Sequence, residues 1–260
     1  MTQKTPSSSV SGTPDDAMRL NKALAQAGVC SRRAADDLIR SGRVFVNGNP
    51  ADLGTPVRPG VDDIRVDGKP LGGPAAGSPQ LYYILNKPIE VVTTVKDPEG
   101  RRTVLDLMGE VGRRRRLFPV GRLDYFSEGL LILTTDGELA NRLMHPRWHM
   151  PKLYRVAVRG DVSERALGTM RSGMTLAEGE RLAPVKAQVV QKDERATVLE
   201  MELVQGVNRQ IRRMCRDLGL TILQLVRVSQ GPLALADLPT GRSRPLTVEE
   251  VAALKKAVGL

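Results

Sequence analysis

The chain contains 260 residues, enough for one large domain or two smaller ones, and its 41% of hydrophobic residues can fill a packed core. Lysine and arginine outnumber acidic residues by 39 to 29, and the net charge of +10 is typical of a polyanion-binding protein, although a merely solvated surface gives the same excess. Cys30 and Cys215 form no CxxC pair or Cys/His cluster, and no apolar run approaches the roughly 18 residues of a membrane span, so we expect no disulfide framework, structural zinc or membrane contact.

The first part of the chain is predicted to be a polar tail followed by a compact segment. Residues 1–17 are rich in Ser, Thr, Pro and Gly and carry no apolar stretch of a signal peptide, so we expect a disordered tail on a cytoplasmic protein. Residues 18–68 place apolar side chains at helical spacing over 19–28 and 31–42, and Ser31 suits the N-cap of the second helix. Two short strands that each end in a turn dipeptide are predicted to follow, over residues 43–48 and 63–68.

The small segment has features of a phosphate-binding module. Arg32 and Arg33 open its second predicted helix, where positive side chains and free backbone amides both favour phosphate oxygens. The pattern of Arg19, Leu20, Gly28, SRRAA, Ile39, GRVFVNG and DIRVDG resembles the small α-L RNA-binding domain named after ribosomal protein four of the small subunit. The resemblance implies RNA as the partner, whereas a helix-turn-helix DNA reader or a hairpin that only packs on the rest of the chain are the competing interpretations.

A larger domain is predicted after a flexible linker. Residues 69–80 are rich in Gly, Pro and Ala, which is typical of a linker, and residues 81–260 form the second domain. Strands are expected at 82–86, 90–95, 130–135, 154–160, 185–191, 197–203 and 222–228, and helices at 138–144, 163–173, 209–219 and 247–257. Because these strands do not alternate regularly with helices, we expect an α+β fold with a mainly antiparallel mixed sheet flanked by helices.

One short turn carries a candidate catalytic carboxylate. Gly121 and Gly129 bracket a turn that precedes a buried apolar run, and this turn contains Asp124 two residues after Arg122. A carboxylate that a neighbouring arginine keeps ionised can act as a nucleophile. From the residues alone, a turn aspartate that hydrogen-bonds its own backbone is the more ordinary interpretation.

Two further patterns concern a strand and a helix. The alternation of a strand would direct Tyr154, Val156 and Val158 to one face, where Tyr154 is either a core tyrosine or a site residue. In the helix over 209–219, an apolar stripe and an arginine stripe repeat at the same spacing, two residues apart, which puts them on opposite faces. The helix is therefore predicted to pack by one face and to offer four guanidinium groups on the other, from Arg209, Arg212, Arg213 and Arg216.

The run GRLDYFSEGLLILTTDG resembles the active-site motif of pseudouridine synthases of the RsuA/RluB type, and of the RluB-like branch in particular. The resemblance extends from LNKP at 85–88 to RPLT at 244–247, with departures at Phe126, Ser127 and Thr135. It implies that Asp124 attacks a uridine flipped out of its helix, at C6 of the base or at C1′ of the sugar. The bond from C1′ to N1 then breaks and C5 is joined to the ribose, which requires no cofactor because substrate and product are isomers.

The resemblance also implies roles around this carboxylate. Arg122 would occupy the space that the flipped uridine leaves, and Tyr154 would stack on the uracil. Arg212 would pair with Asp124, with Arg209 as the alternative partner. Ile211 and Leu123 would line the uracil pocket, no metal would be bound, and RNA contacts are expected from Arg32, Arg33, Lys152, Arg155, Arg209 and Arg213.

Three functions are consistent with these features. The first is site-specific uridine isomerisation in ribosomal RNA, which the RluB-like resemblance assigns to large-subunit (23S) RNA, with small-subunit RNA as the alternative. The second is a non-catalytic RNA-binding factor of ribosome assembly, and the third a DNA-binding regulator. The expected partner is ribosomal RNA or a ribosomal assembly intermediate, and the absence of heptads or an exposed apolar stripe predicts a monomer.

Overall fold

The computed structural model describes residues 17–72, 79–114 and 116–260. The tail predicted over 1–17 lies outside the described residues except for Ala17, as does the central part of the predicted linker, 73–78. The chain divides into two compact units between Pro79 and Gln80. Of the helices in the described ranges, none is long and apolar enough to cross a lipid bilayer.

The first unit combines two helices with short strands. Its elements are β1 (Met18–Arg19), α1 (Leu20–Gln26), α2 (Arg32–Arg40), β2 (Val44–Val46), β3 (Asn49–Pro50), β4 (Pro56–Val57), β5 (Ile64–Val66) and β6 (Lys69–Pro70). The hydroxyl of Ser31 accepts a hydrogen bond from the Ala34 amide and so caps α2 as its sequence predicts. The strands pair antiparallel in the order β3-β2-β5-β6, so Lys69 and Pro70, which composition assigns to the linker, belong to this small sheet.

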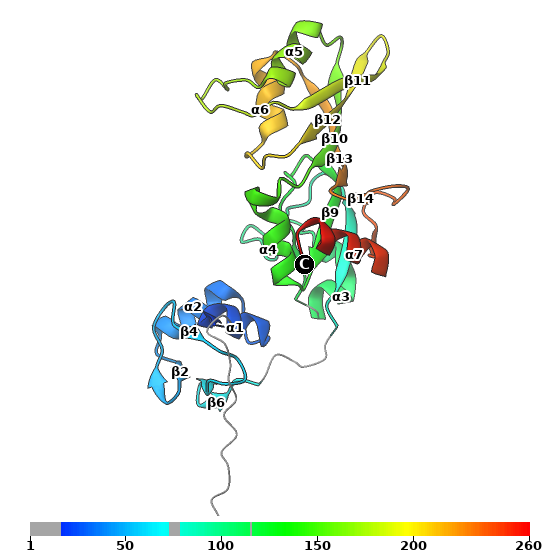
Figure 1. Ribbon diagram of the computed structural model, residues 1–260. Helices are drawn as coiled ribbons and strands as arrows, with labels where there is room; N and C mark the ends of the chain where they lie inside the picture. The colour runs from blue at the N-terminus through cyan, green and yellow to red at the C-terminus, as the bar shows by residue number, and fades with distance from the viewer. Residues whose placement is uncertain (1–16, 73–78, 115) are drawn as a thin grey trace, which may run out of the picture. The chain divides into compact units, whose positions relative to one another are not determined.

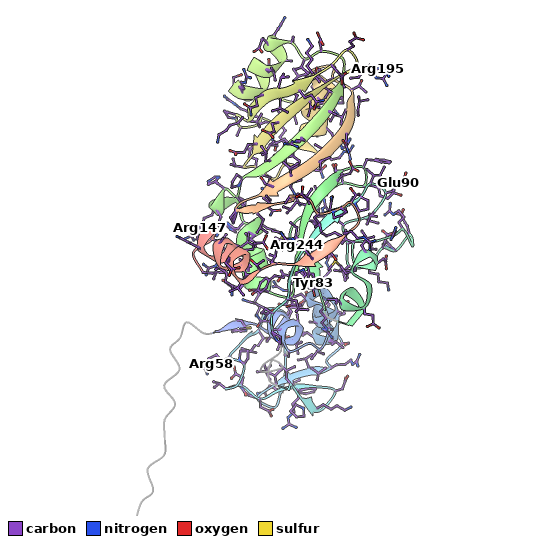
Figure 2. The ribbon with its side chains drawn as sticks, turned by 90° about the vertical axis from the view of Figure 1, so that its right-hand side faces the viewer. Arg58, Tyr83, Glu90, Arg147, Arg195 and Arg244 are labelled. Atoms are coloured by element: carbon purple, nitrogen blue, oxygen red, sulfur yellow. The ribbon has the colours of Figure 1, made fainter. Side chains whose placement is uncertain are left out.

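The second unit is built on one long sheet. Its strands are β7 (Tyr82–Lys87), β8 (Phe118–Pro119), β9 (Glu128–Thr134), β10 (Lys152–Arg159), β11 (Lys186–Lys192), β12 (Ala196–Leu203), β13 (Ile222–Gln230), β14 (Leu233–Ala234) and β15 (Ser243–Pro245). Its helices are η2 (Asp106–Met108), α3 (Gly109–Arg114), α4 (Gly137–Met144), η3 (Pro146–Trp148), α5 (Glu164–Ser172), α6 (Gln210–Asp217) and α7 (Val248–Ala257). Figure 2 shows the sheet extending from the β11–β12 turn at Arg195 to β7 at Tyr83 and β15 at Arg244.

The sheet consists of two halves joined at one seam. The strand order is β11-β12-β10-β13-β9-β7-β15, and β9 with β13 is the only parallel pair among the described strands. This pair matches just two positions, Glu128 with Val226 and Gly129 with Arg227. Gly129 has a φ of +102°, and a side chain there would collide with the backbone of Arg227, so only glycine lets the two strands approach.

Each half of the sheet is covered differently, and the sequence pattern of its strands reflects this. Helices α5 and α6 pack on one face of the β11-β12-β10-β13 half, so β12 alternates between buried and half-buried residues (Figure 1). Both faces of the β7–β9 half are covered, one by α4 and α7 and the other by residues 91–123. The run Leu130–Leu133 is therefore continuously apolar. The α+β fold with a mainly antiparallel sheet is confirmed.

One predicted strand is wrong. Residues 90–95 form no strand, and only Val92 makes an isolated bridge, with Thr103. Glu90 has a φ of +60°, and the hydroxyls of Thr93 and Thr94 donate to the carbonyls of Leu123 and Lys96. These side-chain hydrogen bonds replace the ladder that the β-branched composition favours.

Candidate active site

A cleft of about 720 Å³ opens at the seam of the second unit. The β7–β9 half contributes the loop of Gly121–Asp124, and the β10–β13 half contributes Tyr154 and residues of α6. The 143–150 segment and the 203–208 loop complete the walls. The cleft thus collects groups that are more than one hundred residues apart in sequence.

The loop that carries Asp124 is held by hydrogen bonds on both sides. Gly121 begins it with a φ of +78°, and the Ser127 amide donates to the Asp124 carbonyl at 3.0 Å. The Thr93 hydroxyl donates to the Leu123 carbonyl at 2.7 Å. The Asp124 side chain is 29% exposed, so it is held in a defined loop and stays open to the cleft.

Lys87 holds the backbone of this loop through hydrogen bonds, a role that the sequence did not reveal. Its side chain is fully buried, and Nζ donates to the carbonyls of Pro88, Asp124 and Ser127 at 2.8, 3.1 and 2.9 Å. Burial lowers the pKa of Lys87 to about 8 against the opposing effects of Asp124 and Glu128. The available signal was a lysine that ends a buried strand in LNKP, where a charge requires backbone partners.

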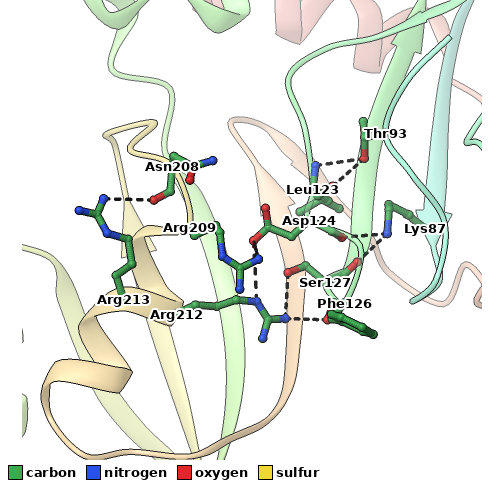
Figure 3. Close-up of polar contacts among 10 residues, drawn as sticks. All are labelled: Lys87, Thr93, Leu123, Asp124, Phe126, Ser127, Asn208, Arg209, Arg212 and Arg213. Atoms are coloured by element: carbon green, nitrogen blue, oxygen red, sulfur yellow. Dashed lines mark hydrogen bonds and ion pairs between the residues drawn. The ribbon is translucent and has the colours of Figure 1, made fainter. Parts of the chain in front are cut away.

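Two arginines of one segment face the Asp124 carboxylate (Figure 3). Arg209 Nη1 lies 3.5 Å and Arg212 Nε lies 3.7 Å from Asp124 Oδ2. The sequence favoured Arg212 over Arg209 as the partner of Asp124, and both arginines lie within ion-pair distance of it. Arg209, which precedes α6 with a φ of +50°, is half exposed, whereas the Arg212 side chain is only 18% exposed.

Arg212 also fixes the loop that it faces. Its Nη2 donates to the Phe126 carbonyl at 2.6 Å and to the Ser127 hydroxyl at 3.1 Å. Burial, together with the charge of Arg209, lowers the pKa of Arg212 although Asp124 opposes the shift. The Phe126 ring points away from the two arginines, so this departure from the family motif leaves the backbone contact in place (Figure 3).

The remaining predicted pocket residues gather around this centre. Tyr154 on β10 is half-buried and lines the cleft, as do the buried Leu123 and Ile211. Arg122 is exposed at the rim of the same cleft. A carboxylate, an aromatic ring and two guanidinium groups therefore converge on one opening.

The floor of the cleft is the face of β10 and β13 that carries Tyr154. Lys152 also lies on this face, and its Nζ donates to the Met150 carbonyl at 3.0 Å. Sequence reasoning missed two further residues, Arg227 and Gln230, which are each 2% exposed. The signal was polar side chains within the otherwise apolar strand of residues 222–230.

Other predicted RNA contacts are on the opposite face of β10 and in the first unit. Arg155 has the opposite orientation to Tyr154 on β10 and pairs with Glu200 at 3.5 Å. Arg32 and Arg33 are exposed at the start of α2 in the first unit. No group of three or more His, Cys, Asp or Glu side chains within the described ranges is arranged to hold a metal ion.

The expectation of four free guanidinium groups on α6 is wrong. Arg213 pairs with Glu178 at 3.2 Å and with Glu180 at 2.6 Å. Arg216 pairs with Glu178 and Asp217, both at 2.7 Å. The acids of residues 178 and 180 come from another segment of the chain, so the helix sequence did not reveal these ion pairs.

The chain matches known families over both units. Residues 81–217 match the family described as RNA pseudouridylate synthase, and residues 18–63 match the S4 domain. A Bacillus subtilis relative, ribosomal large subunit pseudouridine synthase B, is 38% identical over 91% of this chain and 95% of its own length. An RNA pseudouridine synthase of Aquifex aeolicus is 43% identical over 94% of this chain and 96% of its own length.

Two further comparisons agree. The dual-specificity RNA pseudouridine synthase RluF of Escherichia coli is 37% identical over 94% of this chain and 81% of its own length. A solved pseudouridylate synthase structure superposes with a TM-score of 0.65 at 28% identity, covering 91% of this chain and 99% of the other. The resemblance seen in the GRLD loop is thereby confirmed, and the chain belongs to the RsuA/RluB-type family of RNA pseudouridine synthases, with an S4 domain ahead of the catalytic domain.

Proposed function

We propose that this synthase isomerises a specific uridine of large-subunit ribosomal RNA, with Asp124 as the reacting carboxylate. The printed name of the Bacillus subtilis relative supports the large-subunit target. The net charge of +10 and the S4 domain support a structured RNA as the substrate. The domain boundaries proposed for this activity are residues 18–70, which include β6, for RNA binding and 81–260 for catalysis.

The reaction exchanges one bond to the ribose for another. The bond from C1′ to N1 of uracil breaks, the uracil turns, and a new bond joins C1′ to C5. N1 gains a proton and C5 loses one, so atoms and charge balance without an oxidant or reductant. Because the target base must leave its helix to reach a protein side chain, an open cleft is required.

The observation that carries the proposal is the setting of the Asp124 carboxylate. It opens into a cleft of about 720 Å³, and two guanidinium groups lie 3.5 and 3.7 Å from its Oδ2. Ion pairing with these groups orients the carboxylate toward the cleft, where it can attack C6 or C1′ of a bound uridine. Arg212 holds the loop through the Phe126 carbonyl, so it both pairs with the carboxylate and aims it.

The other groups of the cleft would receive the everted nucleoside. Tyr154 would stack on the uracil, with Leu123 and Ile211 as apolar walls, because all three line the cleft. Arg122, exposed at its rim, would occupy the space that the nucleotide vacates. Arg209, which is half exposed, would contact RNA as well as Asp124.

Further RNA contacts, in the first unit and within the cleft, would hold the substrate in register. Arg32 and Arg33 are exposed at the first turn of α2, where the helix amides also favour phosphate. Lys152 would contribute positive charge within the cleft. The S4 domain would in this way raise the affinity for RNA without taking part in the chemistry.

The test replaces Asp124 by asparagine and measures tritium release from uridine labelled at C5. Formation of the C5–C1′ bond expels the C5 hydrogen, so tritium release reports the isomerisation itself. We expect the Asp124→Asn variant to lose turnover while its affinity for RNA changes by less than about threefold. The matched control is Asp161→Asn, at an exposed aspartate that pairs with Lys192, and it should keep the wild-type rate.

Separate large-subunit and small-subunit transcripts from the source organism serve as substrates. Tritium release from the large-subunit transcript alone is the expected result. Release from the small-subunit transcript alone would overturn the target and leave the role of Asp124 standing. A wild-type rate in the Asp124→Asn variant would overturn the mechanism.

A further inference from the structure

We infer that Lys152 and Arg227 form a buried phosphate-binding subsite in the floor of the cleft, which takes a phosphate group directly attached to the target uridine. The inference deepens the proposed function and rests on it, because it requires that the cleft receives this nucleotide. Arg227 has no role in the machinery described above, and Lys152 was assigned there only a general RNA contact.

The pairing of β10 with β13 brings the two cations to one face. Tyr154 is the register partner of Arg227, and Lys152 is the register partner of Gln230. Register partners in antiparallel strands direct their side chains to the same side of a sheet. Arg227 and Lys152 therefore flank Tyr154 on the face that forms the cleft floor, and all of these residues line the cleft.

The cleft lacks the negative charge that would balance these cations. Among the described residues that line it, five side chains are cationic and one is a carboxylate, namely Arg122, Lys152, Arg209, Arg212, Arg227 and Asp124. Asp124 already faces two arginines at 3.5 and 3.7 Å. No carboxylate of the lining is left for Lys152 and Arg227, so the balancing anion must come from the substrate.

The hydrogen bonds of the two cations are also incomplete. Lys152 Nζ donates to the Met150 carbonyl and Arg227 Nε donates to the Leu130 carbonyl at 2.7 Å. Arg227 Nη2 is buried and has no hydrogen-bond partner among the described residues. A buried guanidinium with an unused donor is costly in a folded protein, and such groups are retained where a ligand completes them.

Burial of the lysine is consistent with the same arrangement. Burial lowers the pKa of Lys152 to about 8, and the neighbouring charge of Arg227 adds to this effect. Both causes disfavour the charged amine in the free protein. A phosphate bound between Lys152 and Arg227 would oppose both causes and raise the pKa of Lys152, because a neighbouring negative charge stabilises the ammonium.

A phosphate fits this pair better than other anions of the reaction. RNA carries a phosphate on each side of every nucleoside, and a nucleoside placed against Tyr154 brings its own phosphates next to the register partner Arg227. A guanidinium presents parallel donors that match phosphate oxygens, and an ammonium adds a point charge. Uracil and ribose are neutral and cannot supply the missing charge.

The experiment compares four small probes by isothermal titration at pH 7: uridine, uridine 3′-monophosphate, uridine 5′-monophosphate and inorganic phosphate. Charge-assisted hydrogen bonds to the phosphate should make one of the two nucleotides bind at least about tenfold more tightly than uridine. Which nucleotide is preferred identifies the side of the uridine on which the subsite lies.

Variants then assign the preference to the two cations. Lys152→Met and Arg227→Met should each bring the preferred nucleotide to within about threefold of uridine, because the missing charge no longer distinguishes the two probes. Lys152→Arg keeps the charge and should keep the preference. Lys192→Met, at an exposed lysine outside the cleft, is the matched control and should bind all probes as the wild type does.

Several results would overturn the inference. These are equal affinity for uridine and both nucleotides, a preference that survives in Lys152→Met, or no measurable binding of either nucleotide. Inorganic phosphate binding without any preference for a nucleotide would mean a site for a free anion instead of the RNA chain. Thermal melting of each variant verifies folding, and Lys152→Met decides the outcome if Arg227→Met does not fold. Since the assay involves no turnover, it stands apart from the test of Asp124.

Discussion

Substituting Gly129 by alanine tests whether the seam between β9 and β13 sets the geometry of the active site. Gly129 is paired with Arg227 in the only parallel contact of the described sheet. Its φ is +102°, and an added Cβ would lie 2.7 Å from the Arg227 amide nitrogen and closer still to the Arg227 carbonyl oxygen. Backbone atoms cannot move aside as a flexible side chain can, so the two strands must separate.

The expected loss of stability follows from two effects. An alanine held at positive φ costs about 1–2 kcal/mol, and forcing a methyl group into a packed contact costs about 1–3 kcal/mol. The sum is about 2–5 kcal/mol, which a domain with an unfolding free energy of about 5–15 kcal/mol survives in most of that range. The chemistry should suffer more, since Asp124 lies on one side of the seam while Tyr154 and Arg212 lie on the other. A displacement of about 1 Å can reduce kcat by about 100-fold.

The assay combines urea unfolding with tritium release under saturating RNA. The control is Gly168→Ala in α5, where nothing lies within 4 Å of the new Cβ; this change should raise the unfolding free energy by about 0.5–1 kcal/mol and leave kcat unchanged. A Gly129→Ala variant with wild-type stability and wild-type kcat would show that the seam does not position the catalytic groups.

Three further predictions concern charged residues. Lys87→Met should lower the unfolding free energy by about 1–3 kcal/mol and reduce kcat more than it raises KM, because three backbone carbonyls lose their donor and two of them belong to the Asp124 loop; unchanged urea unfolding would contradict this. Burial lowers the pKa of Lys152 to about 8, whereas a lysine in the unfolded chain has a pKa of about 10.5. Between these two pH values the unfolded chain holds a proton on Lys152 that the folded chain has lost. The unfolding free energy of the wild type should therefore rise with pH over this window. Lys152→Met should lack its share of that rise, which denaturant midpoints at pH 7 and 9.5 would reveal. Arg209→Met should reduce the slope of log Kd against log salt by about 0.7 for single-stranded RNA, whereas Arg213→Met, at a residue already paired with acids, should leave the slope unchanged; equal effects would refute the distinction.

Much of the fold could be predicted because local signals agreed with tertiary structure. The apolar run of Leu130–Leu133 indicated a buried strand, and β9 is indeed buried on both faces. The hydroxyl of Ser31 caps its helix as expected. The prediction failed over residues 90–95, where a β-branched composition was outweighed by threonine hydroxyls that bond the neighbouring backbone.

The candidate site was only partly visible in the sequence. Asp124 lies in a loop whose motif is distinctive, so the family resemblance located it. Lys87 and Arg227 belong to strands with ordinary patterns, and their roles arise from contacts with residues about 40 and 100 positions away. Such contacts depend on strand order and register, which periodicity within a single segment does not encode.

The acids that face α6 have a consequence for how RNA affinity can change. Glu178 and Glu180 both pair with Arg213 of α6. The segment that carries them is held against the end of the same helix, because the Ala177 amide donates a hydrogen bond to the Asp217 carboxylate. Replacing these two glutamates would remove the acidic partners of Arg213 and one acidic partner of Arg216, without altering a residue that pairs with Asp124. Acidic residues that do not line the cleft can therefore weaken the attraction for a nucleic acid without changing the groups that pair with Asp124.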